Sequence, residues 1–133
     1  MKILVISDIH GNAEALKAVL ARESDADTTI FLGDAVSPGP QANETYALLR
    51  ELPGTHVIGN HDSEMLDPSL VAGWPEPWLA LHDWVHATFE PQGFDYLRSL
   101  EPLGDYVVGD LALNLQHGTV PGKLRRGLPD TPD

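Results

Sequence analysis

Four short polar segments of the sequence carry side chains of the types that could do chemistry. Each offers carboxylate, imidazole or amide groups, and each follows an apolar run. The chain has no cysteine, and oxygen and nitrogen ligands suit divalent ions of intermediate hardness such as Mn²⁺, Fe²⁺, Ni²⁺ or Zn²⁺. Two such ions about 3.5–4 Å apart can clamp a phosphate and activate a shared water. The segments are Asp8-Ile9-His10-Gly11-Asn12, Gly33-Asp34, Gly59-Asn60-His61-Asp62 and His117-Gly118.

Each segment also has an ordinary structural explanation. Asp8 could be a turn residue, Gly33-Asp34 is a common turn dipeptide, and Asn60 could hold a tight left-handed conformation. A single histidine such as His117 is more often hydrogen-bonded within the structure than a ligand. In parallel α/β sheets, however, ligands bind beyond the carboxyl ends of the strands. Every expected strand except the first arm of a hairpin ends in one of the four segments, which favours one shared site.

The hydrophobic pattern predicts the elements that would position these side chains. An almost uninterrupted β-branched and leucine run predicts a first strand that is buried on both faces, as in a sheet covered by helices. Asn12 is the expected N-cap of the helix that follows. The alternation of strands and helices predicts a parallel sheet with right-handed crossovers. The expected strands are Lys2–Ser7, Thr28–Leu32 and Thr55–Ile58, and the helices between them are Asn12–Glu23 and Ala42–Leu52.

The second half of the chain predicts two more helices and a hairpin. The first of these helices would place Trp78, Leu81 and Val85 on one face. Two apolar runs separated by a Gly-Asp pair predict the hairpin, whose second arm leads to the last polar segment. The expected ranges are Glu76–Phe89 and Gly93–Leu100 for the helices and 105–108 and 111–115 for the hairpin arms.

Composition sets the outer bounds of the interpretation. The chain has 133 residues, 42% of them hydrophobic, which predicts a single domain with a real core. The formal net charge of −12 argues against stable nucleic-acid binding, which needs clustered bases. The one basic cluster, Lys123, Arg125 and Arg126, is typical of a solvated loop. No signal peptide or membrane-spanning stretch is evident, so we expect a cytoplasmic protein with no membrane partner.

Taken in order, the four segments resemble the motifs of the calcineurin-like metallophosphoesterases. The stretch Ser7-Asp8-Ile9-His10-Gly11-Asn12 followed by Ala15-Leu16 is similar to the small bacterial branch of that family, and so is Gly33-Asp34-x-x-Ser37-x-Gly39-Pro40. The resemblance runs from Met1 to about Gly118. It implies a layered α/β sandwich with a mostly parallel sheet.

Position by position, the resemblance also implies a set of metal ligands. Asp8 and His10 would bind the first of two divalent ions (Mn, Fe, Ni or Zn), and Asp34 would bridge both ions. Asn60 and His117 would bind the second ion. Without metal, the crowded carboxylates are expected to repel one another and to have raised pKa values.

The resemblance further implies a reaction and two catalytic positions. His61 would face the substrate and stabilise the transition state or protonate the leaving oxygen, and Asp62 would orient His61. The reaction would be in-line attack of a metal-bound hydroxide on a phosphate mono- or diester, without a covalent intermediate. The expected partner is therefore a phosphate-ester substrate.

The sequence departs from the family pattern at its end. The pattern closes with a Gly-His-x-His motif, and no histidine follows His117 here. Three explanations remain open: a fragment, which we favour, a shortened relative with a weakened site, or a missing half that another chain supplies. The sequence also leaves open whether the chain forms a homo-oligomer. We therefore expect residues 1–133 to form one metallophosphoesterase-like domain that is incomplete at its C-terminus. The alternative function is a weak or inactive metal-binding or interaction module.

Two further groups of residues allow more than one interpretation. His82 and His86 have the i, i+4 spacing of a zinc-protease motif, but Asp83 stands where that motif has glutamate, so two helix histidines without metal are the commoner case. The three tryptophans could stack a base or sugar, although core packing or a lid wall is commoner. Residues 73–77 and the helix after them are the expected substrate selectors. The tryptophans are Trp74, Trp78 and Trp84.

Overall fold

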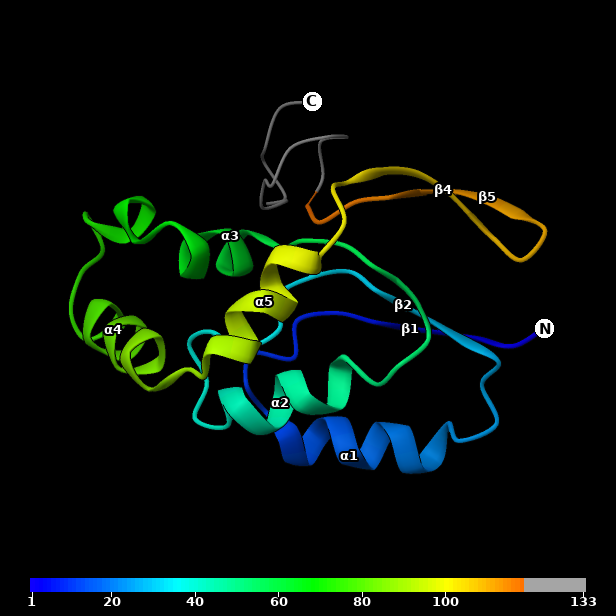
Figure 1. The fold of residues 1–133 in the computed structure, drawn as a ribbon, viewed down its shortest axis with the longest axis horizontal. Coiled ribbons are helices and arrows are strands. Elements are labelled where there is room, and N and C mark those ends of the chain that lie inside the picture. Colours follow the sequence, from blue (N-terminus) through cyan, green and yellow to red (C-terminus); the bar gives the residue numbers. More distant parts are fainter. Residues whose placement is uncertain (119–133) are drawn as a thin grey trace, which may run out of the picture.

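The computed structural model describes residues 1–118, which form a sheet with helices on one side and a hairpin on the other (Figure 1). The helices α1 and α2 run side by side below the sheet, and the hairpin lies above it. The strands are β1 (Ile3–Ile6), β2 (Thr28–Phe31), β3 (Gly54–His56), β4 (Gly104–Val108) and β5 (Leu111–Leu115). The helices are α1 (Ala13–Arg22), α2 (Ala42–Leu49), α3 (Asn60–Leu66), the 3₁₀ helix η1 (Pro68–Val71), α4 (Trp78–Thr88) and α5 (Pro91–Ser99).

The parallel α/β arrangement that the sequence predicts is confirmed. Strand β2 lies in the middle, with β1 and β3 parallel to it on either side. Ile6 is opposite Phe31, and Phe31 is opposite His56, so the three strands reach their carboxyl ends together. The loops that follow them therefore meet at one edge of the sheet.

The prediction that the first strand is buried on both faces is wrong. Within the described residues β1 is an edge strand paired with β2 alone, and the side chain of Val5 is 55% exposed. The doubly covered strand is β2, where Ile30 and Phe31 are buried in different hydrophobic clusters. A run of β-branched residues predicts a strand but does not say where in the sheet it lies.

Helix α1 begins where the sequence predicts. The side chain of Asn12 accepts a hydrogen bond from the backbone N–H of Ala15 at 3.0 Å, which caps the first turn. Leu16, one turn into the helix, is 1% exposed and packs in the core between helices and sheet together with Phe31 and Leu49. Burial of this face holds α1, and hence the loop that precedes it, against the sheet.

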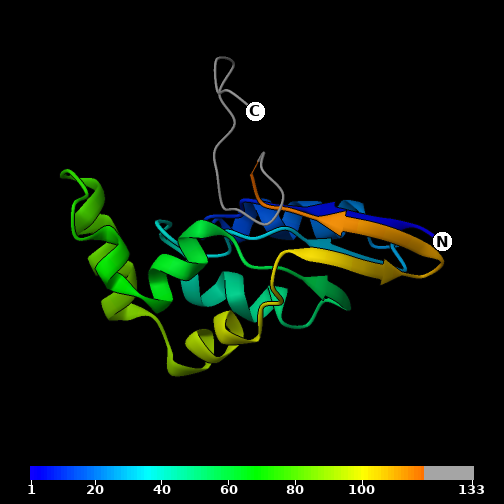
Figure 2. The same cartoon turned by 90° about the horizontal axis from the view of Figure 1, so that it is seen from above.

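The segment after β3 contains α3 and η1, which the sequence did not predict, and then α4 and α5, which it did. Of the expected apolar face of α4 only Val85 is buried, together with His82, whereas Trp78 and Leu81 are 53% and 42% exposed. Figure 2 shows the reason: α4 lies at one end of the molecule, beyond the carboxyl ends of the strands, so only a narrow face of it meets the core.

The predicted hairpin is confirmed as β4 and β5, antiparallel with Tyr106 opposite Leu113. Val108 and Leu115 are buried against Ile30 and Val57 of the sheet region, which fixes the hairpin on the sheet. The second arm thereby brings the chain back to the carboxyl ends of the parallel strands. Among the described residues, no helix has the length and apolar character to cross a membrane. The basic cluster around Arg125 lies outside the described residues.

Candidate metal centre

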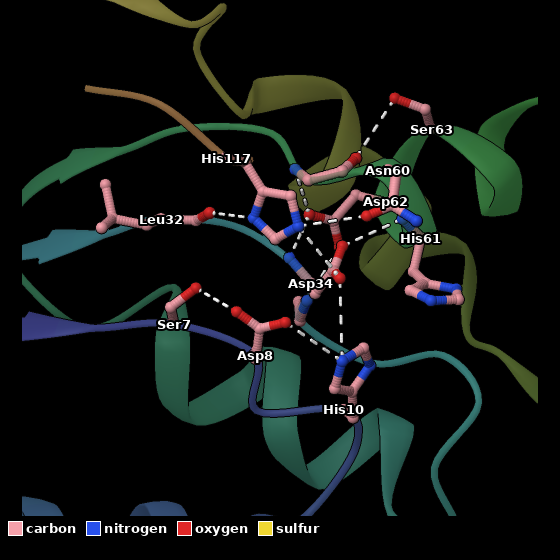
Figure 3. Close-up of polar contacts among 12 residues, drawn as sticks. Ser7, Asp8, His10, Leu32, Asp34, Asn60, His61, Asp62, Ser63 and His117 are labelled. Carbon is pink, nitrogen blue, oxygen red and sulfur yellow. Dashed lines mark hydrogen bonds and ion pairs between the residues drawn. The ribbon is translucent and has the colours of Figure 1, made fainter. Parts of the chain in front are cut away.

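The five side chains expected as metal ligands meet at the carboxyl edge of the sheet (Figure 3). Asp8 and His10 follow β1, and Asp34 follows β2. Asn60 is the first residue of α3, and His117 comes just after β5. Four chain segments thus contribute to one cluster, although His117 is 109 residues (117 − 8) from Asp8 in sequence.

The backbone under three of these side chains adopts an uncommon conformation. Asp8, His10 and Asp34 have φ angles of 56°, 49° and 64°, in the left-handed region that non-glycine residues seldom occupy. Such conformations cost about 1–3 kcal/mol each and concentrate at functional sites. The surrounding packing must therefore stabilise this arrangement, which supports a function for the cluster beyond structural turns.

The ends of β2 and β3 approach each other so closely that only glycine fits between them. A Cβ on Gly33, whose φ is 97°, would lie 2.6 Å from the Cα of Gly59. A Cβ on Gly59 would in turn collide with the side chain of Asp34. These two glycines allow Asp34 and Asn60 to come from adjacent strands into one site.

Asp34 lies at the centre of the cluster, and its side chain is 3% exposed. Its Oδ2 atom is 3.2 Å from Nε2 of His117 and 3.7 Å from Nε2 of His10. Its Oδ1 atom accepts a hydrogen bond from the backbone N–H of His61 at 2.9 Å. Asp8 joins from the more exposed side, with Oδ1 3.4 Å from Nε2 of His10.

Backbone carbonyl groups orient the two histidines on either side of Asp34. His10 donates from Nδ1 to the carbonyl of Ser37 at 2.7 Å, and His117 donates from Nδ1 to the carbonyl of Leu32 at 2.6 Å. The Nε2 atoms are therefore the ones that face the carboxylates. Metal-binding histidines are commonly held by a hydrogen bond from the other ring nitrogen in this way.

The expected rise in the pKa of Asp34 is wrong. Burial alone would raise it, but the hydrogen bond and charge of His117 outweigh burial and lower the pKa of Asp34 below its ordinary value. The same hydrogen bond to Asp34 raises the pKa of His117 to about 9. In the protein without metal, a protonated His117 thus neutralises the carboxylate, which removes the repulsion that the expectation assumed.

The donor atoms are of the kinds that bind divalent cations, and they fall into two overlapping groups. Two groups have all their donor atoms within 4.8 Å of one another: His10, Asp34 and His61, and Asp8, Asp34 and His117. Asp34 belongs to both, as a bridging carboxylate would. The amide oxygen of Asn60, 3.1 Å from Nε2 of His117, adds a further donor. The grouping differs from the expected one in bringing His61 within reach of a metal.

Asp62 was expected to orient His61, but its carboxylate does not contact the His61 ring. Its carboxylate is fully buried and accepts hydrogen bonds from the backbone N–H groups of Asp34, Ala35 and Gly59, each at 2.8 Å. Burial raises the pKa of Asp62 to about 6, against the lowering effect of these bonds. The side chain therefore fixes the loops after β2 and β3 relative to each other rather than orienting an imidazole.

The carboxylate beside the His61 ring is Glu64, which the sequence analysis missed. Oε2 of Glu64 is 2.8 Å from Nδ1 of His61, an ion-pair contact rather than a directed hydrogen bond. Burial raises the pKa of Glu64 and lowers that of His61. Glu64 follows His61 at i+3, a spacing that places two side chains on one helix face. The i, i+3 spacing is informative only within a helix, and the sequence analysis did not predict helix α3.

Comparisons with known proteins agree with this geometry. Residues 1–126 match the model of a family described as calcineurin-like phosphoesterase. An uncharacterized protein of Methanocaldococcus jannaschii is 46% identical over 74% of this chain and 41% of its own length. A symmetrical bis(5′-nucleosyl)-tetraphosphatase of Pectobacterium atrosepticum is 30% identical over 90% of this chain and 44% of its own.

A solved structure agrees as well. The crystal structure of a metallophosphoesterase from Sphaerobacter thermophilus matches 84% of this chain and 45% of its own, with a TM-score of 0.66 and 33% identity. The chain thus spans less than half the length of these relatives. Members of this family use divalent metals, and the side chains assembled around Asp34 are of the kind that binds them. The chain belongs to the calcineurin-like phosphoesterase family.

Proposed function

We propose that this chain carries the site of a metal-dependent phosphoesterase, which hydrolyses a phosphate mono- or diester with two divalent ions such as Mn²⁺, Fe²⁺, Ni²⁺ or Zn²⁺. The observation that supports this most directly is the buried carboxylate of Asp34, shared by two groups of donor atoms. Asp8, His10, Asn60 and His117 are the proposed ligands around it. A structural turn would not need two backbone-oriented imidazoles aimed at one buried acid.

The metals would supply two things that the side chains cannot: positive charge against the phosphate, and an activated water as nucleophile. The protein's part is to hold the ligands. His10 and His117 each keep a proton on Nδ1 for a backbone carbonyl, which leaves Nε2 as the nitrogen for a metal. At His117 the metal would displace the proton that the hydrogen bond to Asp34 favours. Asp62 holds the loop of Asp34 in place through three backbone hydrogen bonds.

His61 is the proposed partner of the leaving group. Its Nδ1 atom is buried beside Glu64, so Nε2 is the nitrogen available to a substrate. In hydrolysis the bond from the water oxygen to phosphorus forms as the ester P–O bond breaks, and the leaving oxygen takes a proton. We propose that His61 donates that proton or stabilises the charge that develops there.

Metal content and turnover of Asp34→Asn test the proposal. The substitution removes the shared anionic carboxylate, so the purified variant should bind less Mn²⁺ and lose Mn²⁺-dependent hydrolysis of phosphate esters. Asp110→Asn, which removes the same charge at the hairpin turn, is the control and should change neither. Unchanged metal content in Asp34→Asn would contradict the bridging role. Metal binding without turnover in the wild type would favour the alternative, a metal-binding module.

A further inference from the structure

A pocket of about 410 Å³ opens directly beside the proposed metal ligands. Its volume is within the roughly 300–1,000 Å³ range of sites that hold small molecules. Two of its walls, His10 and His61, are also part of the metal centre, so whatever fills the pocket lies next to the reacting phosphate. The residues that line it are His10, Pro38, His61, Trp74, Pro75 and Trp78.

The lining is rich in rings, and its only ionisable side chains are the two imidazoles. The other lining residues are two indoles and two proline rings. None of the lining residues is a lysine or arginine, so this pocket offers no cation to a second phosphate. A flat, uncharged ring is the chemistry that such walls recognise, because every aromatic ring can stack on an indole face.

The Trp74 indole in the wall of the pocket packs against two imidazole rings. The centroid of the Trp74 ring is 5.6 Å from that of His61 and 5.7 Å from that of His82, with edge-to-face angles of 78° and 64°. His82 is fully buried under this contact, and the backbone N–H of Trp74 donates to Val71 at 2.9 Å. Trp78, by contrast, is 53% exposed. The pocket thus combines a fixed wall with an open one.

We propose that this pocket binds a planar aromatic ring in the leaving group of the phosphate ester, an inference that rests on the proposed function and adds the substrate class to it. A ring bound in this pocket lies against a wall that includes His61, the proposed partner of the leaving group. The ring can be bonded directly to the carbon of the ester, as in a benzyl ester, or it can be a nucleobase that a sugar separates from the ester. Both share the stacking chemistry, and the experiment below distinguishes them.

Matched ester pairs separate the ring from the reactivity of the ester. Adenosine 5′-monophosphate and ribose 5-phosphate differ in the base alone, and benzyl phosphate and methyl phosphate differ in the phenyl ring while their leaving oxygens are similar. We expect the wild-type chain with Mn²⁺ to have a lower KM for the aromatic member of at least one pair. The pair that shows the effect identifies the distance at which the ring is attached.

The tryptophan variants locate the effect. Trp78→Ala should raise KM for the aromatic ester roughly 5- to 100-fold, with little change in kcat and in the KM of its partner, because one stacking face is lost from ground and transition state alike. Trp84→Ala is the control, since Trp84 is 52% exposed on the same helix and does not line the pocket. Equal effects on both members of a pair, or equal effects of Trp78→Ala and Trp84→Ala, would overturn the inference.

A binding measurement keeps the inference testable if no ester is hydrolysed, an outcome that would contradict the proposed function alone. Saturation-transfer NMR with adenosine and with benzyl alcohol reports contact between the protein and the ring without any reaction. We expect transfer to the aromatic protons in the wild type and in Trp84→Ala, and its loss in Trp78→Ala. No transfer to either compound in the wild type would overturn the proposed pocket, whatever the metal centre does.

Discussion

His10 and His117 show how single hydrogen bonds prepare a site before any metal is present. Each ring is fixed by a backbone carbonyl at Nδ1, and each directs Nε2 toward the same carboxylate. Neither imidazole has to reorient to become a ligand. The side chains lose their conformational entropy when the protein folds, so metal binding does not carry this entropic cost.

His61 lies beside the metal ligands and also lines the pocket. If it acts on the leaving oxygen, His61→Ala should lower turnover about 10²–10⁴-fold and leave metal content nearly intact. The loss should be largest for alkyl phosphates and smaller for nitrophenyl phosphates, whose leaving oxygen barely needs a proton. Steady-state kinetics on both ester types, with metal analysis of the same samples, provide the measurement.

Two outcomes would assign His61 differently. An equal loss on alkyl and nitrophenyl esters would indicate phosphate binding or charge stabilisation. A parallel loss of metal would make His61 a ligand, as its distance to His10 and Asp34 allows. Glu64→Gln should give a milder form of the same result, because it removes the charge beside Nδ1 but not the ring.

At this scale the sequence predicted which side chains would meet but not all of their partners. Asp8, Asp34 and Asn60 could be placed because each follows an apolar run, and parallel strands end at one edge. The partner of His61 could not be predicted, because the choice between Glu64 and Asp62 depends on which residues of α3 face the ring. Adjacent acids in a polar segment carry no such information.

At the scale of elements, β3 is joined to α5 through a half-buried histidine. Nδ1 of His56 is 3.1 Å from the hydroxyl oxygen of Tyr96, and the ring packs edge-to-face on Phe31. Burial lowers the pKa of His56 below its ordinary value of 6.5. As pH falls below that value, the unfolded chain binds a proton at His56 before the folded protein does, so this residue makes the fold less stable in acid.

We therefore expect His56→Gln to weaken the pH dependence of stability. The free energy of unfolding of the wild type should decrease from about pH 8 to about pH 5, and that of the variant should decrease less, because glutamine binds no proton in either state. Urea denaturation of both proteins at the two pH values measures the difference. Identical decreases in wild type and variant would show that His56 is not a source of the acid sensitivity.

Helix α3 was missed because its sequence has no hydrophobic pattern at its start. Helix α3 begins with Asn60, His61 and Asp62, which offer no apolar periodicity, and its start is stabilised by the Asp62 carboxylate on the Gly59 N–H. Strand β1 was recognised as a strand, but its edge position depends on which other segments pair with it. Periodicity describes one element at a time, whereas edges and buried faces belong to the assembled sheet.

At the scale of the molecule, metal binding should stabilise the fold as a whole. The proposed ligands come from the ends of β1, β2 and β5 and from the start of α3, so a metal links the sheet, the hairpin and a helix. Binding to the folded state alone adds about 2.7 kcal/mol at 100 times the dissociation constant. For a chain of this size that corresponds to a rise in Tm of roughly 10 °C.

Thermal unfolding with and without Mn²⁺ tests this linkage. The rise should disappear on adding a chelator and should be absent in Asp34→Asn. Because the chain carries a net charge of −12, any cation could relieve general repulsion, so NaCl at matched ionic strength is the necessary control. A rise of the same size with NaCl, or in Asp34→Asn, would show that the effect is screening and not binding at the centre.

The three backbone hydrogen bonds of Asp62 stabilise the fold, and stability determines how much of a protein a cell retains. Replacing it with alanine leaves three buried N–H groups without an acceptor, at a cost of about 1–3 kcal/mol each. A loss of only 1–2 kcal/mol can already change abundance several-fold, since unfolded molecules are removed by proteases. A change at Asp62 would therefore appear in living cells as missing protein rather than as a slow enzyme, although the residue borders the proposed site.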